Sequence, residues 1–128
     1  MIQLLTHCTM TNNKIYISGP ITGFNLEERK NFFAQMAELA ESIGFTAVNP
    51  FDNGLGPDAD YAAHMVADIK MLIECQAILM LPDWDLSYGA KLELNVAVAC
   101  HMETYKVVTE WDKDDYTIQP LTPKEIIQ

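Results

Sequence analysis

The sequence predicts an α/β protein, a three-layer sandwich in which helices cover both faces of a parallel, flavodoxin-like or Rossmann-like sheet of four to five strands. Strand-like and helix-like segments alternate from residue 14 to residue 109, and such alternation is typical of parallel sheets. The run AILML at residues 77–81 is apolar throughout, as expected of a strand that is covered on both faces.

The first two elements are a strand and an amphipathic helix. Residues 14–18 (KIYIS) have strand composition, and the turn residues Gly19 and Pro20 follow them. Over residues 26–43, apolar side chains recur at three- and four-residue spacing, which is the period of a helix. Asn25 suits the N-cap of this helix, which therefore starts directly after the first loop.

The later elements continue the alternation and complete the predicted sheet. Residues 51–57 contain two glycines and a proline, so we expect an irregular connection there, which can form a flap over a site. The remaining elements are expected to be strand 45–48, helix 60–75, strand 77–81, helix 88–100 and strand 105–109.

The chain length favours one domain, because 128 residues leave no room for a second core. We expect residues 1–13 to be an N-terminal extension and residues 14–110 to be the α/β domain. Residues 111–128 are expected to be a C-terminal tail with a short helix, part of the same domain. Thr122 and Glu125 have the spacing of a capping box, and so short a helix needs a surface to dock on.

The charge balance excludes several classes of partner. The formal net charge is −10, with 18 acidic and 8 basic residues, so we expect no nucleic-acid polymer and no anionic membrane surface as partner. One small phosphorylated ligand stays compatible, because backbone N–H groups can hold a phosphate. The sequence has no long apolar segment and no cationic start, so we expect no membrane-spanning helix and no signal peptide.

The cysteines and histidines do not indicate a metal site. Three single cysteines without close pairing indicate a reducing compartment, and we predict a cytoplasmic protein. No set of residues has metal-ligand spacing. We therefore expect no metal and no other cofactor.

The fold class predicts where a ligand binds. In such sheets, ligands lie beyond the carboxyl ends of the strands, where the strand order reverses. The loops SGPITGF and PDWDLSYG follow the first and third strands and are expected to line the site. Ser87 and Gly89 offer a hydroxyl and an unshielded N–H at a helix start, which suits a hydroxyl or phosphate group. Glu93 lies one turn further along this helix, and Asp68 lies within the preceding helix.

Each candidate also has a purely structural interpretation. Glu93 and Asp68 suit solvated helix positions. Asp83 and Asp85, on the turn around Trp84, either orient a ligand or cap the helix that follows. Tyr16 lies in a buried strand, where its hydroxyl needs a partner such as an enclosed carboxylate. His64 precedes Asp68 by one helical turn, which can place it near the site, although a structural or solvated role is the commoner one.

These residues together resemble a known family. From KIYISGPITG, through the helix that contains Asp68, to IECQAILMLPDWDLSYGAKLE, residues 14–109 resemble the nucleoside 2-deoxyribosyltransferase superfamily. The resemblance is strongest to a phage and bacterial branch known as a domain of unknown function. Three separated motifs occur in the order that the superfamily has.

The resemblance implies roles for four residues. In characterised relatives, which are deoxyribosyltransferases and nucleoside 5′-monophosphate N-glycosidases, the glutamate of the S-x-G-x-x-x-E segment is the nucleophile, and Glu93 matches it. An aspartate that assists the leaving base matches Asp68. A tyrosine that contacts the nucleophile matches Tyr16. Ser87 matches a serine that contacts the 5′-phosphate in the monophosphate hydrolases.

Substrate contacts are expected from both loops. Pro20 and Thr22 stand where the phosphate-specific relatives have a serine and an arginine, so the need for a 5′-phosphate stays open. The residues predicted to bind the substrate are Ser18, Gly19, Pro20, Ile21, Gly23, Asp85, Ser87 and Gly89.

The implied activity is cleavage of an N-glycosidic bond or transfer of a 2-deoxyribosyl group, with a nucleoside or nucleotide as substrate. A carboxylate close to C1′ stabilises the oxocarbenium-like centre of such a reaction. The alternative is a non-catalytic nucleotide-binding or sensor module on the same fold. We also expect a homodimer or a higher even oligomer, because the tail helix needs a docking surface, Trp111 offers an aromatic anchor and relatives complete their sites across subunits.

Overall fold

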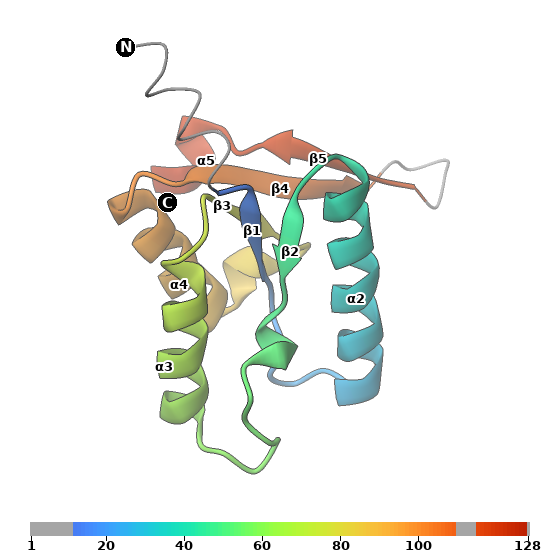
Figure 1. Ribbon diagram of the computed structural model, residues 1–128, viewed down its shortest axis with the longest axis vertical. Helices are drawn as coiled ribbons and strands as arrows, with labels where there is room; N and C mark the ends of the chain where they lie inside the picture. The colour runs from blue at the N-terminus through green and yellow to red at the C-terminus, as the bar shows by residue number, and fades with distance from the viewer. Residues whose placement is uncertain (1–11, 110–114, 128) are drawn as a thin grey trace.

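The computed structural model describes residues 12–109 and 115–127 (Figure 1). One five-stranded sheet has the order β2-β1-β3-β4-β5. The first four strands are parallel, and β5 is antiparallel to β4. The strands are β1 (Lys14–Ser18), β2 (Thr46–Val48), β3 (Ala77–Met80), β4 (Glu103–Thr109) and β5 (Tyr116–Pro120).

Helices cover both faces of this sheet, so the predicted α/β sandwich is confirmed. Figure 1 shows α2 on one side of the sheet and α3 with α4 on the other. The helices are α2 (Leu26–Ser42), α3 (Tyr61–Leu72), α4 (Tyr88–Ala99) and α5 (Pro123–Ile127), and short 3₁₀ turns occur at η1 (Pro50–Asp52) and η2 (Trp84–Leu86).

The pleat of β1 divides the core into two clusters. Ile15 and Ile17 pack in the cluster that contains Phe33 of α2. Tyr16 points to the opposite face and joins the cluster that contains Leu72 of α3 and Leu94 of α4. This alternation follows from the two-residue period of a strand. It also explains the continuous apolar run of β3, whose four residues are all buried.

The strand order creates an opening at the carboxyl ends of β1 and β3. From β1 the chain crosses to β2 on one side, and it then returns to β3 on the other side of β1. Loops that leave β1 and β3 therefore separate, and a crevice forms between them at the switch point. Gly19, directly after β1, is needed for close packing there, since a Cβ at this position would lie 2.8 Å from the Cβ of Leu81.

The tail contributes a strand that the sequence analysis did not predict. In β5, Ile118 lies opposite Val107 of β4, and β5 has only five residues. A short antiparallel strand at an edge has too few apolar positions to stand out in a sequence. It becomes recognisable only through its pairing partner.

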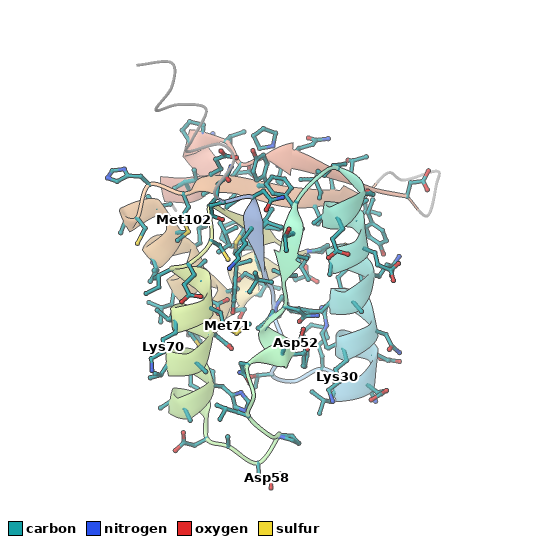
Figure 2. All side chains as sticks on the ribbon, in the orientation of Figure 1. Lys30, Asp52, Asp58, Lys70, Met71 and Met102 are labelled. Atoms are coloured by element: carbon teal, nitrogen blue, oxygen red, sulfur yellow. The ribbon has the colours of Figure 1, made fainter. Side chains whose placement is uncertain are left out.

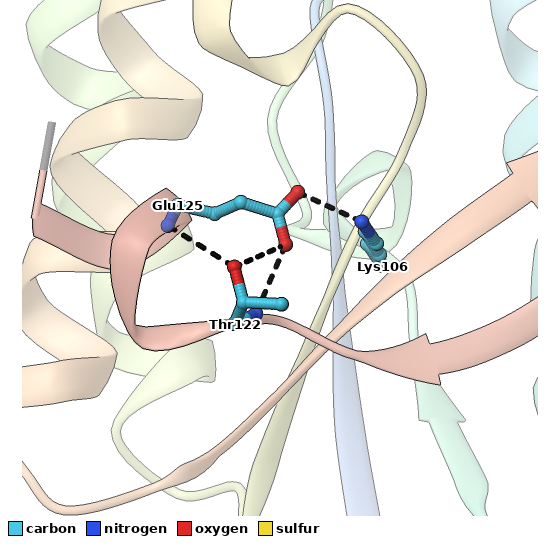
Figure 3. Close-up of polar contacts among 3 residues, drawn as sticks. All are labelled: Lys106, Thr122 and Glu125. Atoms are coloured by element: carbon cyan, nitrogen blue, oxygen red, sulfur yellow. Dashed lines mark hydrogen bonds and ion pairs between the residues drawn. The ribbon is translucent and has the colours of Figure 1, made fainter.

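The short tail helix docks on its own chain, so its need for a surface is met without a partner subunit. Leu121 is buried, and Ile126 packs against the cluster of α3 and α4. The predicted capping box is present: Thr122 N–H donates to Glu125 Oε1 at 2.9 Å and Glu125 N–H donates to Thr122 Oγ1 at 3.3 Å (Figure 3). Trp111, the predicted aromatic anchor, lies outside the described residues.

Within residues 12–109 and 115–127, none of the helices combines the length and the apolar character that a membrane crossing requires.

Replacing Glu125 by glutamine is expected to weaken the attachment of the tail. The Lys106 ammonium, whose Nζ lies 2.8 Å from Glu125 Oε2, and the Thr122 backbone N–H lower the pKa of Glu125 to about 2. The stability that the ionised Glu125 gives to the fold is fully present above the ordinary carboxyl pKa, and it is lost as the pH falls toward 2. Because the side chain is 31% exposed, we expect Glu125→Gln to cost under about 1 kcal/mol.

Urea unfolding at neutral and acidic pH measures the effect. The gap between wild type and Glu125→Gln should close in acid, whereas Glu38→Gln on the exposed face of α2 should show no such gap. A gap that is equal at both pH values would mean that the ion pair does not stabilise the tail.

Candidate active site

A cavity of about 1050 Å³ opens at the carboxyl ends of β1 and β3. Its walls are the loop after β1, the start of α2, the connection between β2 and α3, one face of α3 and the start of α4. Tyr16, Asp68 and Glu93 all line this cavity. Three elements that are far apart in the sequence therefore bring the three predicted catalytic side chains to one space.

Glu93 is held by two hydroxyl groups from the central strand. Tyr16 Oη donates to Glu93 Oε2 at 2.7 Å, and Ser18 Oγ donates to Oε1 at 2.6 Å. Tyr16 and Ser18 are two residues apart on β1, so their side chains leave the same face of the sheet, and α4 packs on this face. Glu93 is only 5% exposed, so the solvated interpretation of this residue is wrong.

Burial dominates the electrostatics of Glu93. It raises the pKa of this carboxyl to about 7, although the hydrogen bonds from Ser18 and Tyr16 act in the opposite direction and the charge of Asp68 adds to the rise. Burial, followed by the charge of Glu93, also raises the pKa of Tyr16 far above its ordinary value. Tyr16 therefore stays a neutral donor, and Glu93 changes its charge near neutral pH.

Asp68 is the second buried carboxyl group of the cavity. It is 8% exposed, which makes its solvent-facing interpretation wrong as well. Its Oδ1 accepts a hydrogen bond from Asn53 Nδ2 at 2.8 Å. Burial raises the pKa of Asp68, and the Asn53 hydrogen bond lowers it in part.

Most of the predicted substrate-binding residues lie on the cavity wall, namely Gly19, Pro20, Ile21, Gly23, Ser87 and Gly89. Two do not. Ser18 has no exposed surface and uses its hydroxyl on Glu93, so it positions a carboxylate instead of contacting a ligand. Asp85 lies on the exposed side of the η2 turn, and the neighbouring Asp83 lines the cavity in its place.

The start of α4 is shaped for close approach. Ser87 is the N-cap of α4, and its Oγ accepts a hydrogen bond from Ala90 N–H at 3.2 Å. A Cβ on Gly89 would lie 3.0 Å from the Tyr61 hydroxyl. A larger residue at position 89 would therefore close the space between α3 and α4, on the wall where Ser87 also lies.

The sequence analysis missed two kinds of residue at this site. Asn53 joins Asp68 to His64, with 3.0 Å between Asn53 Nδ2 and His64 Nδ1. The sequence analysis noted that His64 and Asp68 lie one helical turn apart, but no motif indicated Asn53. Lys30 at the N-terminal end of α2 (Figure 2) lines the cavity. Its position in the second turn of a helix gave no signal. Among the described residues, no group of His, Cys, Asp and Glu is arranged to hold a metal ion.

Comparison with known proteins assigns the family. The model of the family described as a domain of unknown function, DUF4406, matches residues 13–106. The chain belongs to the DUF4406 family. No curated protein matches this DUF4406 chain.

A solved structure supports the fold. The DUF4406 chain is similar to the 2-desoxiribosyltransferase from Leishmania mexicana, with 20% sequence identity and a TM-score of 0.59. The similarity covers 77% of this chain and 65% of that one. The predicted resemblance to the deoxyribosyltransferase superfamily is thus confirmed for the fold.

Glu93→Gln is expected to stabilise the DUF4406 fold as the pH rises. The folded-state pKa of Glu93 is about 7, above the roughly 4.3 of an unfolded chain. As the pH rises from about 4 to about 7, ionisation of Glu93 is favoured in the unfolded chain and opposed in the folded one. The free energy of unfolding of the wild type therefore falls over this range. Relative to wild type, Glu93→Gln should gain on the order of 3 kcal/mol between about pH 4 and pH 8.

Urea titrations across this range test the expectation. Glu38→Gln serves as the surface control, because its stability should run parallel to that of the wild type. If Glu93→Gln also runs parallel to the wild type, the carboxyl is not held at a raised pKa.

Proposed function

We propose that this DUF4406 protein cleaves the N-glycosidic bond of a nucleoside or a nucleoside 5′-monophosphate, with Glu93 as the nucleophile. The observation that carries the proposal is the buried carboxyl of Glu93, which two hydroxyl donors hold at the wall of an open cavity. A fixed, buried carboxylate is suited to stabilise positive charge that develops at a sugar carbon.

The proposed first step needs both carboxyl groups. Glu93, ionised, attacks C1′ and forms an ester, while the bond between C1′ and the base nitrogen breaks. The electron pair of that bond goes to the base, which takes a proton from Asp68. Burial raises the pKa of Asp68, which favours the protonated form that a general acid requires.

The second step decides between hydrolysis and transfer. Water attacks C1′ and gives the free sugar, or another base attacks and gives a new nucleoside; in both cases the proton of the attacking group returns to Asp68 and Glu93 is released. The similarity in fold to a 2-desoxiribosyltransferase supports either outcome. A cavity of about 1050 Å³ has room for a nucleotide and a second small molecule.

Two parts of the cavity wall can bind a 5′-phosphate. Ser87 and the N-terminus of α4 lie on one wall, and Lys30 lies on another. Lys30 offers a positive charge that the first loop, with Pro20 and Thr22, does not provide. The substrate class therefore includes monophosphates beside nucleosides.

A second candidate is a non-catalytic nucleotide-binding module. The observation that favours it is the raised pKa of Glu93, about 7, since a protonated glutamate is no nucleophile. Such a module would bind the same ligands and release no base.

Incubation with a panel of nucleosides and 5′-monophosphates tests the proposal. Chromatography should detect free base with the wild type, and Glu93→Ala should lose several orders of magnitude in rate while it keeps its fold. Intact-protein mass spectrometry should detect a sugar ester on the wild type and none on Glu93→Gln. Glu38→Gln is the control and should turn over normally. Ligand binding without any base release across the panel would favour the non-catalytic module.

The exposed rim of the cavity supports assembly into a homodimer or higher even oligomer. Tyr88 is 87% exposed, Leu86 78% and Tyr61 58%, and all three line the cavity mouth. Large apolar side chains grouped at one opening are typical of an interface. In the proposed assembly, a second copy of the chain covers this rim and shields the reaction from water.

Light scattering at micromolar concentration tests the assembly. The mass should be at least twice the 14.4 kDa of one chain, and Leu86→Lys should reduce it to that of the monomer without unfolding. The exposed Val66 on the outer face of α3 gives a control, Val66→Lys. A wild-type mass near that of one chain would contradict the proposed assembly.

A further inference from the structure

The connection between β2 and α3 lines part of the cavity, and Asn53 contributes an amide side chain there. This segment, in which Asp52 and Asp58 are labelled in Figure 2, contains η1 and then Asn53. Asn53 lines the cavity beside Asp68 and His64. The side chain of Asn53 contacts both of these residues, which lie one helical turn apart on α3.

Each polar atom of the Asn53 amide already has a partner within the protein. The Oδ1 atom accepts a hydrogen bond from Leu55 N–H at 2.9 Å, which fixes the orientation of the amide. The two hydrogens of Nδ2 then point to Asp68 Oδ1 at 2.8 Å and to His64 Nδ1 at 3.0 Å. An amide with this set of contacts has no donor left for a substrate, so its role lies in the contacts themselves.

These contacts also fix the state of His64. Because the Asn53 amide nitrogen can only donate, His64 Nδ1 is the acceptor and carries no proton. The proton is on Nε2, which donates to the carbonyl oxygen of Gly56 at 3.1 Å. A neutral His64 is thus bound at both ring nitrogens, and it anchors Asn53 from the side opposite to Leu55.

One polar atom in this network remains without a protein partner among the described residues, and it is Asp68 Oδ2. Since Oδ1 is occupied by the Asn53 donor, a proton on Asp68 belongs on Oδ2. The other titratable groups that line the cavity are His64 and Tyr61 of α3, Glu93 and Tyr88 of α4, Tyr16 of β1, Lys30 of α2 and Asp83. Asn53 is the neutral residue that donates to Asp68.

We propose that Asn53, anchored by neutral His64, is a positioning residue that holds Asp68 with Oδ2 as its proton-carrying atom, directed to the leaving base. The inference rests on the proposed function. In the proposed step, the proton leaves Asp68 Oδ2 for the base nitrogen as the bond to C1′ breaks. Asn53 then stabilises the aspartate that remains, through the same hydrogen bond to Oδ1.

Two substitutions distinguish the hydrogen bond that Asn53 donates to Asp68 from the one that it accepts from Leu55 N–H. Asn53→Ala removes the donor to Asp68 and the acceptor for Leu55 N–H. Asn53→Asp keeps an oxygen for Leu55 N–H but removes the donor. The matched control is Asn49→Ala on the same connection, because the Asn49 side chain accepts a hydrogen bond from Phe51 N–H and does not line the cavity.

The kinetic readout compares leaving bases. Both Asn53 variants should lose about 10- to 100-fold in kcat with an unactivated base, a part of the range for general acid catalysis. They should lose little with an activated base that needs no proton. Asp68→Asn should show the same pattern, and Asn49→Ala should show none. An equal loss with both kinds of base would overturn the inference, since a merely loosened connection gives that result.

Carbon-13 NMR of the Asp68 carboxyl gives a readout that needs no turnover. The pKa of Asp68 should rise in Asn53→Ala and stay constant in Asn49→Ala. An unchanged pKa in Asn53→Ala would overturn the inference whether or not the protein turns over a substrate. Failure of the proposed function is recognised separately, by a wild type that releases no base from any member of the panel.

Discussion

The two hydrogen bonds from Tyr16 and Ser18 to Glu93 connect α4 to the central strand, and the site depends on them. A buried carboxyl group without donors destabilises a fold by several kcal/mol, on the order of the whole net stability of a small domain. Here both oxygens of Glu93 have a hydroxyl donor from β1. The α4 helix is therefore held in register with β1 by polar contacts, as well as by the packing of Leu94 and Ala97.

The sequence analysis could predict the layers because their signals are local. Helix periodicity, helix caps and the apolar run of β3 depend on residues that are close together in the sequence. The helices and strands that these patterns predict occur where they were expected. The true role of Ser18, which was expected to bind the substrate, and the presence of Asn53, which was missed, depend on contacts distant in the sequence. Ser18 lies 75 positions from the Glu93 that it contacts, and Asn53 lies 15 from Asp68. A serine at a strand end and an asparagine in a turn look ordinary in a sequence.

The turn after β3 is a second place where the sequence could not predict which side chain reaches the cavity. The turn after β3 was expected to contribute Asp85, but the left-handed backbone at Asp83, with φ of 67°, starts a 3₁₀ turn that leaves Asp83 on the cavity wall. Such a conformation is uncommon for a residue other than glycine. Hydrophobic periodicity does not indicate such a backbone conformation. The sequence could therefore place this loop at the site, but it could not predict which of Asp83 and Asp85 lines the cavity.

The environments of Glu93 and Asp68 give the two carboxyl groups different partners. Glu93 has two hydroxyl donors, no cation among the described residues contributes to its pKa, and this pKa is about 7. Asp68 has an amide donor and the imidazole of His64 beside it. In the proposed reaction, positive charge that develops on a bound sugar favours the ionised form of Glu93, and ionised Glu93 favours that charge, because the coupling between the two is reciprocal. In that reaction, a carboxyl group that is partly protonated in the free protein would be shifted to its ionised form by the charge that it stabilises. The cavity needs no permanent cation beside Glu93 to do this, which agrees with the acidic composition of the chain.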